Sequence, residues 1–475
     1  MTFGFRRFFV GSAAALALSV SGTAPAWAES LADALIGAYK HSGLIEQNRA
    51  VLRAADEDVS QAIADLRPVI SWAGGITRDF ANQRSFNNLA NAYVTSGGAT
   101  NEVGMSLIAE ITLYAGGANR LRISAAKEAV LATRAGLVSI EQQVLLRAVN
   151  AFMEVERAKE IVSLRRNGVR VFQQEVRAAK DRFEVGEVTR TDVALAEASL
   201  AQGESALASA RGQLVSAEEE YRAAVGRKPG NLVRPKRDPK LPSSVDSAKA
   251  QAVRIHPDMI TVQHQVAANE IAIQIAEASM KPTVSLEGRY GVTEDIDNPS
   301  FTHGGSIGLS AGGAIYQGGK LRSVVRQARA NRDASRGNLH VVRHSVQQNV
   351  GNAFVQRAVA DASREAFESQ VRAATVAFRG VREEAKLGAR TTLDVLDAEQ
   401  DLIDARANLI SAQVDETIAA YSILASIGLL TTDALQLNVP KYDPAAYYNL
   451  VKDAPSAVSK QGRDLDRVLR ALGKE

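Results

Sequence analysis

The chain contains no cysteine, so it forms no disulfide bridges and cannot be anchored through a lipidated cysteine. Aromatic residues make up only 5% of its 475 residues, which argues against a thick globular core. Beyond the N-terminal region, no apolar run approaches the ~18–20 residues of a membrane-spanning helix. The net charge of +3, from 56 basic and 53 acidic residues, and the lack of a basic stripe with interleaved aromatic residues argue against a nucleic-acid partner.

Signals for catalysis and metal binding are equally poor. Two overlapping G-x-S-x-G matches, at 304–308 and 308–312, fall on a predicted strand, whereas a nucleophile elbow needs a strand-to-helix turn. His340 and His344 lie one helical turn apart, but no third metal ligand is near them in the sequence. A Walker A motif is also lacking. We therefore expect no enzymatic activity, no cofactor and no metal, and any energy must come from partner proteins.

Residues 1–28 have the pattern of a secretory signal peptide. Two arginines precede a mostly apolar segment at 8–20, and Ala-Trp-Ala at 26–28 forms a cleavage signal. The alternative is an N-terminal membrane anchor, which fits less well because Gly11 and the following serine interrupt a short apolar segment. The mature chain of 475 − 28 = 447 residues is therefore predicted to work outside the cytoplasm.

The most informative feature of the sequence is an internal repeat, in which residues 113–226 return without a gap at 315–428. The Tyr-x-Gly-Gly motif at 114–117, for example, recurs at 316–319, an offset of 316 − 114 = 202 residues. A constant offset over this length indicates two copies of one structural unit whose length matters. The predicted organisation is a first repeat at 29–226, a Pro-rich linker at 227–243, a second repeat at 244–428 and a C-terminal periplasmic segment and tail at 429–475.

Each copy opens with a predicted helix, at residues 31–66 and 247–280, that ends before a proline. The two prolines lie 282 − 68 = 214 residues apart, so the first copy is 214 − 202 = 12 residues longer. We place this surplus in a polar loop at 81–101. Two segments that alternate between apolar and polar side chains flank the turn region of each copy. These four predicted strands are about 69–79, 103–115, 283–293 and 305–317.

A very long helix is predicted after each Tyr-x-Gly-Gly motif. Its apolar residues recur every 3.5 positions on average, as in the seam of a left-handed coiled coil. The first of these helices, about 119–185, would be ~100 Å long at a rise of 1.5 Å per residue. Each long helix is expected to end at a glycine, Gly186 or Gly388. A return helix then starts at Thr191 or Thr392 and completes a helical hairpin.

The alternating strands fit the wall of a transmembrane barrel, with one face toward lipid and the other toward a wet lumen. The alternative is an amphipathic sheet on a soluble core, but no compact partner domain is evident in the sequence. Four strands cannot close a barrel, and an open edge in lipid would leave backbone groups unpaired. Three chains would supply twelve strands, so we expect a homotrimer surrounded by outer-membrane lipids.

These features together resemble the TolC-like outer-membrane efflux protein family, and particularly its type I secretion branch. The resemblance covers the mature chain to about Pro444. It rests on the doubled helix–strand–strand–helix–helix order, the Tyr-x-Gly-Gly strand ends, residues 388–398 and the closing residues 437–444. It implies a mixed α and β fold, in which a membrane β-barrel, four strands per chain and twelve in a trimer, continues into a long antiparallel α-helical coiled-coil tunnel. Ser42-Gly43 stands where the family often has Asn-Pro.

The resemblance also implies a periplasmic gate at the tips of the helical hairpins. It places Asp394 and Asp397 around a constriction, and it makes Arg390 a tie to Thr191 and Asp192 of a neighbouring hairpin. A second explanation for the acidic residues is helix capping, because an aspartate shortly after a threonine stabilises any helix N-terminus.

Alanine replaces one residue of the family's latch. A tyrosine that often joins it is Ala385 in this chain, so this part of the gate is left open.

The sequence therefore predicts an exit duct in the outer membrane of a Gram-negative bacterium, with a large periplasmic part. It would serve a tripartite efflux pump, a type I secretion system or both. Its expected partners are a periplasmic adaptor (membrane fusion) protein and an inner-membrane transporter, either ABC-type or proton-driven. The main alternative is a periplasmic coiled-coil scaffold or tether with a soluble β module, and a secreted hydrolase is a more distant one. The cargo, and the identity of transporter and adaptor, are left open.

Overall fold

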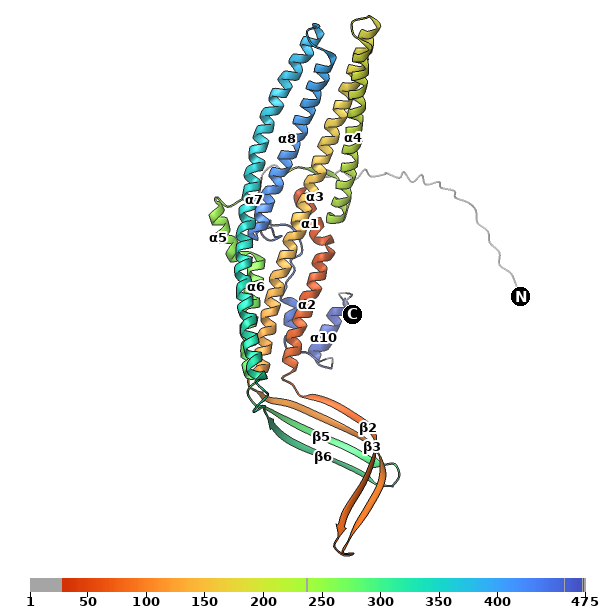
Figure 1. Cartoon of the computed structure of the whole chain (residues 1–475), viewed down its shortest axis with the longest axis vertical. Helices are drawn as coiled ribbons and strands as arrows, with labels where there is room; N and C mark the ends of the chain where they lie inside the picture. Colours follow the sequence, from red (N-terminus) through yellow and green to blue (C-terminus); the bar gives the residue numbers. More distant parts are fainter. Residues whose placement is uncertain (1–27, 236–237, 457, 472, 474–475) are drawn as a thin grey trace, which may run out of the picture.

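The computed structural model describes residues 28–235, 238–456, 458–471 and 473. The predicted signal peptide therefore lies outside the described residues, apart from Ala28. Figure 1 shows an elongated molecule in which long helices form one end and a four-stranded sheet forms the other. Within the described part of the chain, no helix combines the length and the apolar character needed to cross a membrane.

The sheet contains all four predicted strands, in the order β2-β3-β5-β6, and every neighbouring pair is antiparallel. Its strands are β2 (Val69–Asn87), β3 (Ala92–Ala115), β5 (Thr283–Asp295) and β6 (Phe301–Gly312). A separate pair of short parallel strands, β1 (Ala28–Ser30) and β4 (Asn231–Val233), joins the start of the first repeat to the linker.

Two of the strand predictions need correction. The prediction of a polar loop at 81–101 is wrong, because β2 and β3 stay paired through this region up to a turn at 88–91. The surplus of the first repeat thus lengthens a hairpin, whose polar side chains are compatible with strands that have water on both faces. The fourth strand ends at Gly312 rather than 317, because its partner β5 begins only after Pro282.

The opening helix of each repeat is also broken, where one continuous helix was expected. The first repeat has α1 (Leu31–His41) and α2 (Gly43–Ala64), and the second has α5 (Val245–Ile255) and α6 (Pro257–Ala278). Ser42 has an extended backbone and caps α2, its hydroxyl accepting a hydrogen bond from the backbone N–H of Ile45 at 3.3 Å. In the second repeat, proline occupies the first position of α6, where its missing N–H costs nothing.

The long hairpins have the expected positions and matched lengths. Helices α3 (Ala118–Glu184) and α7 (Lys320–Lys386) each span 67 residues, and their return helices α4 (Arg190–Val225) and α8 (Thr392–Ile427) each span 36. An apolar cluster that includes Phe152, Tyr221 and Val414 holds α3, α4 and α8 together. The two hairpins therefore lie side by side, with α8 against α3 (Figure 1).

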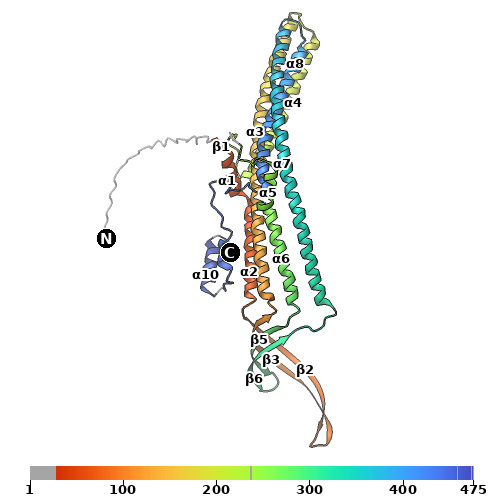
Figure 2. The same cartoon turned by 90° about the vertical axis from the view of Figure 1, so that its left-hand side faces the viewer.

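The C-terminal segment carries two short helices, α9 (Ala446–Val451) and α10 (Lys460–Ala471). Tyr447 donates a hydrogen bond to Glu57 of α2 at 2.6 Å, and the Arg67 guanidinium contacts the backbone carbonyls of Asp453 and Ala454. In Figure 2, α10 lies beside α2 and on the opposite side from α7. The tail is thus attached to the outside of the first opening helix, close to the start of the sheet.

Candidate membrane wall and tunnel tips

One face of the sheet is apolar across all four strands. Trp72 is paired with Leu107, which in turn is paired with Tyr290, and Ile307 of β6 extends the same face. Trp72 is 74% exposed and Ile307 is 84% exposed, and no described helix covers this side of the sheet in Figure 1. An apolar face of this size is unfavourable in water and stable against lipid hydrocarbon.

The opposite face of the sheet is polar. Glu110 and Glu287 lie directly opposite each other in the β3–β5 pairing, and Arg289 donates a hydrogen bond to Ser106 Oγ at 3.3 Å. Like charges at such close range are tolerable only where water solvates them. The two faces therefore separate a lipid-facing side from a water-facing side, as the sequence alternation predicts.

The serines of the two G-x-S-x-G matches lie within β6, and neither is at a strand-to-helix turn. Ser310 is hydrogen-bonded to Ser285 of the neighbouring strand at 2.9 Å. His340 and His344 are both exposed on α7. Among the residues that the structure describes, no group of three or more His, Cys, Asp or Glu side chains could hold a metal ion.

Both hairpin tips begin with the same glycine turn. Gly186 and Gly388 have φ values of 79° and 77°, a left-handed conformation that favours glycine. In the second tip, the N–H of Ala389 bonds to the carbonyl of Glu384 at 2.9 Å and that of Gly388 to the carbonyl of Ala385 at 3.1 Å. This is a Schellman arrangement, and it repeats in the first tip. The glycines thus end the outgoing helices and reverse the chain.

The return helices start with matching capping boxes. Thr391 and Asp394 exchange hydrogen bonds, with the Asp394 N–H donating to Thr391 Oγ1 at 3.1 Å and the Thr391 N–H donating to Asp394 Oδ2 at 2.9 Å. Thr189 and Asp192 do the same in the first repeat, so α4 begins at Arg190 and not at Thr191 as expected. The hydrogen bonds from Thr391 lower the pKa of Asp394 from its usual range.

The predicted gate residues are distributed over two tips. Arg390, Asp394 and Asp397 lie at the α7–α8 tip, whereas Thr191 and Asp192 lie at the α3–α4 tip (Figure 1). Arg390 Nε is 2.8 Å from Glu384 Oε2 of its own hairpin, and among the described residues it makes no ion pair with the other tip. Asp397 is exposed, and among the residues that the structure describes it has no capping partner of this kind.

Sequence reasoning missed a charged group between the hairpins near the tips. Glu399 of α8 is buried, and this burial raises its pKa to about 6. Arg382 of α7 faces Glu175 of α3 at 3.8 Å, and Ala385 lines the adjoining cavity of about 210 Å³. A signal was present in the sequence, because Glu399 interrupts an apolar seam that Val395 and Leu402 otherwise continue.

Comparison with known proteins agrees with this geometry. The family described as "Outer membrane efflux protein" matches residues 38–227 and 250–429. The chain belongs to this family. It is 35% identical to the outer membrane efflux protein BepC of Brucella suis over 92% of this chain and 95% of BepC. It is 25% identical to the outer membrane protein TolC of Salmonella enteritidis, over 95% of this chain and 91% of TolC.

Two more similarities extend the comparison. The alkaline protease secretion protein AprF of Pseudomonas aeruginosa is 24% identical over 63% of this chain and 64% of AprF. The solved structure of the outer membrane protein VceC from Vibrio cholerae has the same fold, with a TM-score of 0.71 at 20% identity, over 84% of this chain and 96% of VceC. The resemblance to TolC-like proteins and the expected fold class are thus confirmed.

Family membership also confirms the expected function and location. The chain is an outer-membrane exit duct for efflux and secretion, with a periplasmic part. The family is one of transport channels rather than enzymes, which removes the support for a secreted hydrolase or for a periplasmic scaffold.

Proposed function

We propose that three copies of this chain build one continuous duct, a twelve-stranded barrel that opens into a helical tunnel. The sheet of one chain ends in β2 on one side and β6 on the other, and neither has a second strand partner within the described residues. Unpaired strand edges are not stable in hydrocarbon, so the edge strands of neighbouring copies must pair with each other.

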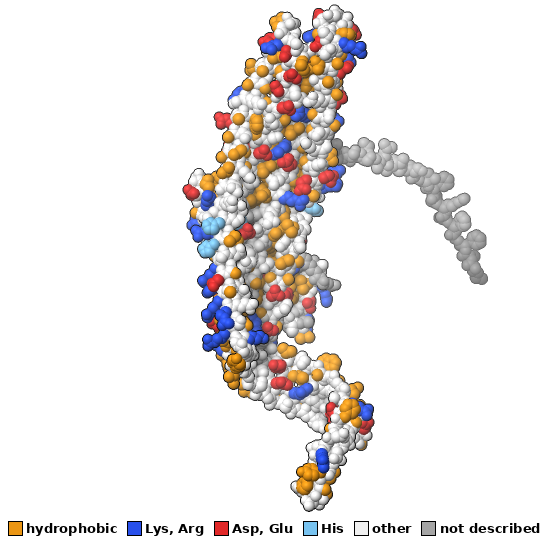
Figure 3. Space-filling view, viewed as in Figure 1, with side chains coloured by type: hydrophobic (Ala, Val, Ile, Leu, Met, Phe, Trp, Pro, Cys, Tyr) orange, Lys and Arg blue, Asp and Glu red, His pale blue; other side chains and the backbone are white. Residues whose placement is uncertain are grey.

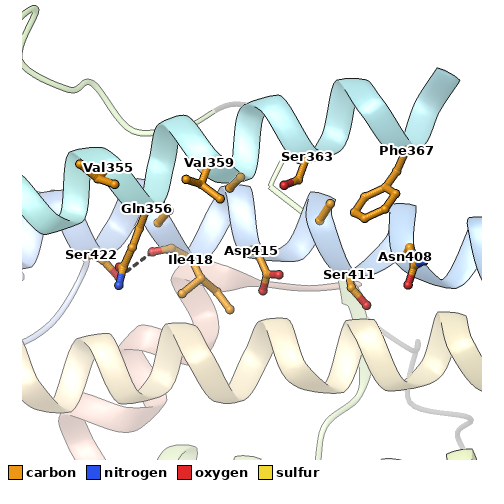
Figure 4. A pocket seen from close by; sticks show the side chains of 13 residues that line it. Val355, Gln356, Val359, Ser363, Phe367, Asn408, Ser411, Asp415, Ile418 and Ser422 are labelled. Carbon is orange, nitrogen blue, oxygen red and sulfur yellow. Dashed lines mark hydrogen bonds between the residues drawn. The ribbon is translucent and has the colours of Figure 1, made fainter. Parts of the chain in front are cut away.

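An open groove on the second hairpin supports this assembly. Figure 4 shows Val355, Val359 and Phe367 of α7 above Ile418 of α8, lining a cavity of about 480 Å³. Val355 is 62% exposed and Val359 is 59% exposed. Apolar side chains this exposed on a helix seam indicate that a further helix covers them.

The internal repeat identifies that helix. Subtracting the offset, 355 − 202 = 153, makes Met153 of α3 the counterpart of Val355. Met153 is fully buried in the apolar cluster to which α8 contributes residues such as Val414, whereas no helix of the same chain covers the exposed Val355 among the described residues. Because α4 is the counterpart of α8, the α4 helix of the next copy is the matching cover. This difference between two equivalent positions carries the proposal.

The α4 helix has an apolar position ready for such a contact. Val215 is 59% exposed, although its repeat counterpart Thr417 (215 + 202) is buried. Within the chain, Arg157 of α3 pairs with Asp415 of α8. The repeat counterpart of Arg157 is Val359 of α7 (157 + 202), and that of Asp415 is Gln213 of α4 (415 − 202). We therefore expect Val359 of one copy to face Gln213 of the next.

These equivalences define a direct test. Since the chain has no cysteine, the double variant Val359→Cys/Gln213→Cys carries the only two thiols. Because an Arg–Asp ion pair spans more than a disulfide can, a short bis-maleimide crosslinker is applied to the membrane. It should link chains into covalent trimers on a denaturing gel, while either single variant gives no trimer. A wild-type protein that inserts stably as a monomer, or a double variant that links only within one chain, would refute the assembly.

We further propose that the tunnel tips receive cargo from an inner-membrane transporter through a periplasmic adaptor protein. A 67-residue helix reaches ~100 Å from the sheet at 1.5 Å per residue, which places the tips deep in the periplasm. The sequence has no nucleotide-binding motif, so a partner protein must supply the energy for export, and the tips are the part of the duct that reaches farthest toward the inner membrane. Relatives in efflux and in protease secretion support both uses.

A unique cysteine at the tip, Glu187→Cys, tests the partners. Crosslinking in intact cells should capture an adaptor and not an unrelated periplasmic protein, whereas a cysteine at Asn88, in the turn at the far end of the sheet, should capture neither. Comparison of secreted proteins and drug sensitivity with and without the chain then separates protein cargo from drug cargo. If loss of the chain changes neither the secreted proteins nor the drug sensitivity, the proposal is refuted for protein cargo and for drug cargo.

The third part of the proposal is a gate formed by Arg390, Asp394 and Asp397 with Thr191 and Asp192 of a neighbouring copy. Within the described residues of one chain, Arg390 pairs with Glu384 of its own hairpin and not with Thr191 or Asp192, which supports a tie that forms between neighbouring copies. The Arg390 side chain is exposed at the tip, so it can exchange its ion pair with Glu384 for a contact with a neighbouring copy.

A further inference from the structure

Basic side chains are concentrated where α7 leaves the sheet. Between 320 and 336 the only acidic residue is Asp333, whereas six residues are basic. They are Lys320, Arg322, Arg326, Arg329, Arg332 and Arg336. In Figure 3, basic side chains gather on the left-hand edge over the lower part of α7, just above the sheet. The nearly balanced charge of the whole chain conceals this local excess.

The basic residues nearest the sheet differ from those farther along α7 in their ion pairs. Arg329 pairs with Glu277 at 3.1 Å and Arg336 with Glu270 at 2.5 Å, so α6 neutralises the part of the row farther from the sheet. By contrast, the exposed residues Lys320, Arg322 and Arg326 make no ion pair among the described residues. Three positive charges per chain are therefore available to an anion from outside the chain.

Exposed apolar residues lie directly beside these charges. Ile315 is fully exposed and Tyr316 is 85% exposed, both in the short link between β6 and α7. Tyrosine is favoured where lipid meets water, because its ring is apolar and its hydroxyl is polar. The combination recurs in the first repeat, where exposed Tyr114 precedes exposed Arg120, the counterpart of Arg322.

The height of these residues matches the lipid headgroups. The apolar face of the sheet marks the hydrocarbon core, and α7 starts directly beyond it. At 1.5 Å per residue, Arg326 lies only ~9 Å along the helix from Lys320. The headgroup layer on each side of a bilayer is about 5–8 Å thick.

We propose that this surface, the basic collar formed by Lys320, Arg322 and Arg326 with Ile315 and Tyr316, binds anionic phospholipids of the periplasmic leaflet. The guanidinium groups of the two arginines match phosphate oxygens in charge and geometry. The two apolar side chains enter the boundary of the acyl chains. The collar would hold the duct at a fixed height in the membrane and surround its barrel with anionic lipid.

A triple variant tests the collar. Lys320→Gln/Arg322→Gln/Arg326→Gln removes the charges but keeps residues that favour a helix. Lipid binding to the purified oligomer is measured by native mass spectrometry against phosphatidylglycerol and phosphatidylcholine. Wild type should prefer phosphatidylglycerol, and the variant should lose about tenfold or more of this binding. The variant Arg322→Lys/Arg326→Lys, which keeps the charge, should retain most of it.

The matched control is Arg343→Gln/Arg372→Gln/Arg379→Gln, which removes three exposed charges from the same helix at least ~34 Å from Lys320, since 343 − 320 = 23 residues. It should bind lipid as wild type does. Equal binding of both lipids by wild type, or equal loss in triple variant and control, overturns the proposal. Competition by inorganic phosphate at the lipid's own concentration also overturns it, because the collar would then be a free-anion site.

Discussion

At the residue scale, the structure separates two aspartates that the sequence treats alike. Asp394 is committed to the capping box with Thr391, so helix capping is sufficient to explain it. Asp397 is exposed one turn farther along α8 and has no such role. Any effect on ion passage is therefore expected to depend more on Asp397 than on Asp394.

Single substitutions can distinguish these roles in planar bilayers. Asp397→Ala should reduce cation selectivity by at least roughly twofold, because it removes one carboxylate from every copy around a narrow opening. It should leave the midpoint of thermal unfolding unchanged. Asp394→Ala and its counterpart in the first tip, Asp192→Ala, should each lower that midpoint, because each removes a capping box. Wild-type selectivity and wild-type cation block in Asp397→Ala would place the constriction elsewhere.

Glu399 is expected to make the tip region sensitive to pH. Burial raises its pKa to about 6, above the ordinary value of 4.5, so the folded state favours the protonated form. The resulting stabilisation is complete below the ordinary pKa and is lost as the pH rises through about 6. Arg406 and Arg382 oppose this shift, while Glu175 adds to it.

Thermal unfolding between pH 5 and pH 7.5 measures this effect. The midpoint of wild type should fall over this range relative to Glu399→Gln, whose side chain does not titrate. Replacement of the exposed Glu365 by glutamine serves as the control and should follow wild type. Parallel pH profiles for wild type and Glu399→Gln would show that the buried carboxyl is not the cause.

At the scale of helices and strands, much of the fold was predictable because its signals are repetitive. An ungapped offset and a sustained heptad pattern located the first long helix at 119–185, against an observed Ala118–Glu184. Local ambiguity caused the errors. Ser42 can continue a helix or cap one, and the packing of α1 against α3 decides in favour of the cap.

The tip site was predictable only in part, for a related reason. Capping boxes are local and visible in Thr-x-x-Asp, although the first return helix begins one residue earlier than expected, at Arg190. The group of Glu175, Arg382 and Glu399 comes from three different helices. Its proximity depends on how the hairpins pack, which no spacing within one helix reveals.

Equal hairpin lengths lead to a deletion experiment. Removing seven residues between 144 and 162 of α3 takes out one heptad and should displace one tip by ~10 Å relative to its neighbour. Transport should fail, while the same deletion at the equivalent place in α7 as well should restore assembly in part. Cargo export and oligomer size are the measurements. Wild-type export by the single deletion would show that length matching is not required.

At the scale of the whole molecule, three features agree on one orientation. The apolar face of the sheet requires lipid, the basic collar lies at one end of that face, and the hairpin tips lie at the other end of the molecule (Figures 1 and 3). The long hairpin between β2 and β3 extends past the lipid-facing segment on the side away from the helices. It should therefore project to the cell exterior.

This orientation can be tested in living cells because wild type has no thiol background. A membrane-impermeant maleimide should label Asn88→Cys, in the turn between β2 and β3, on intact cells. Glu187→Cys, at a hairpin tip, should react only after the outer membrane is permeabilised, since the tip lies beyond a helix ~100 Å long. Equal labelling of both positions on intact cells would mean that the helices do not lie in the periplasm. Labelling of neither until permeabilisation would place the whole sheet inside the cell envelope, and the apolar face would then need a protein partner instead of lipid.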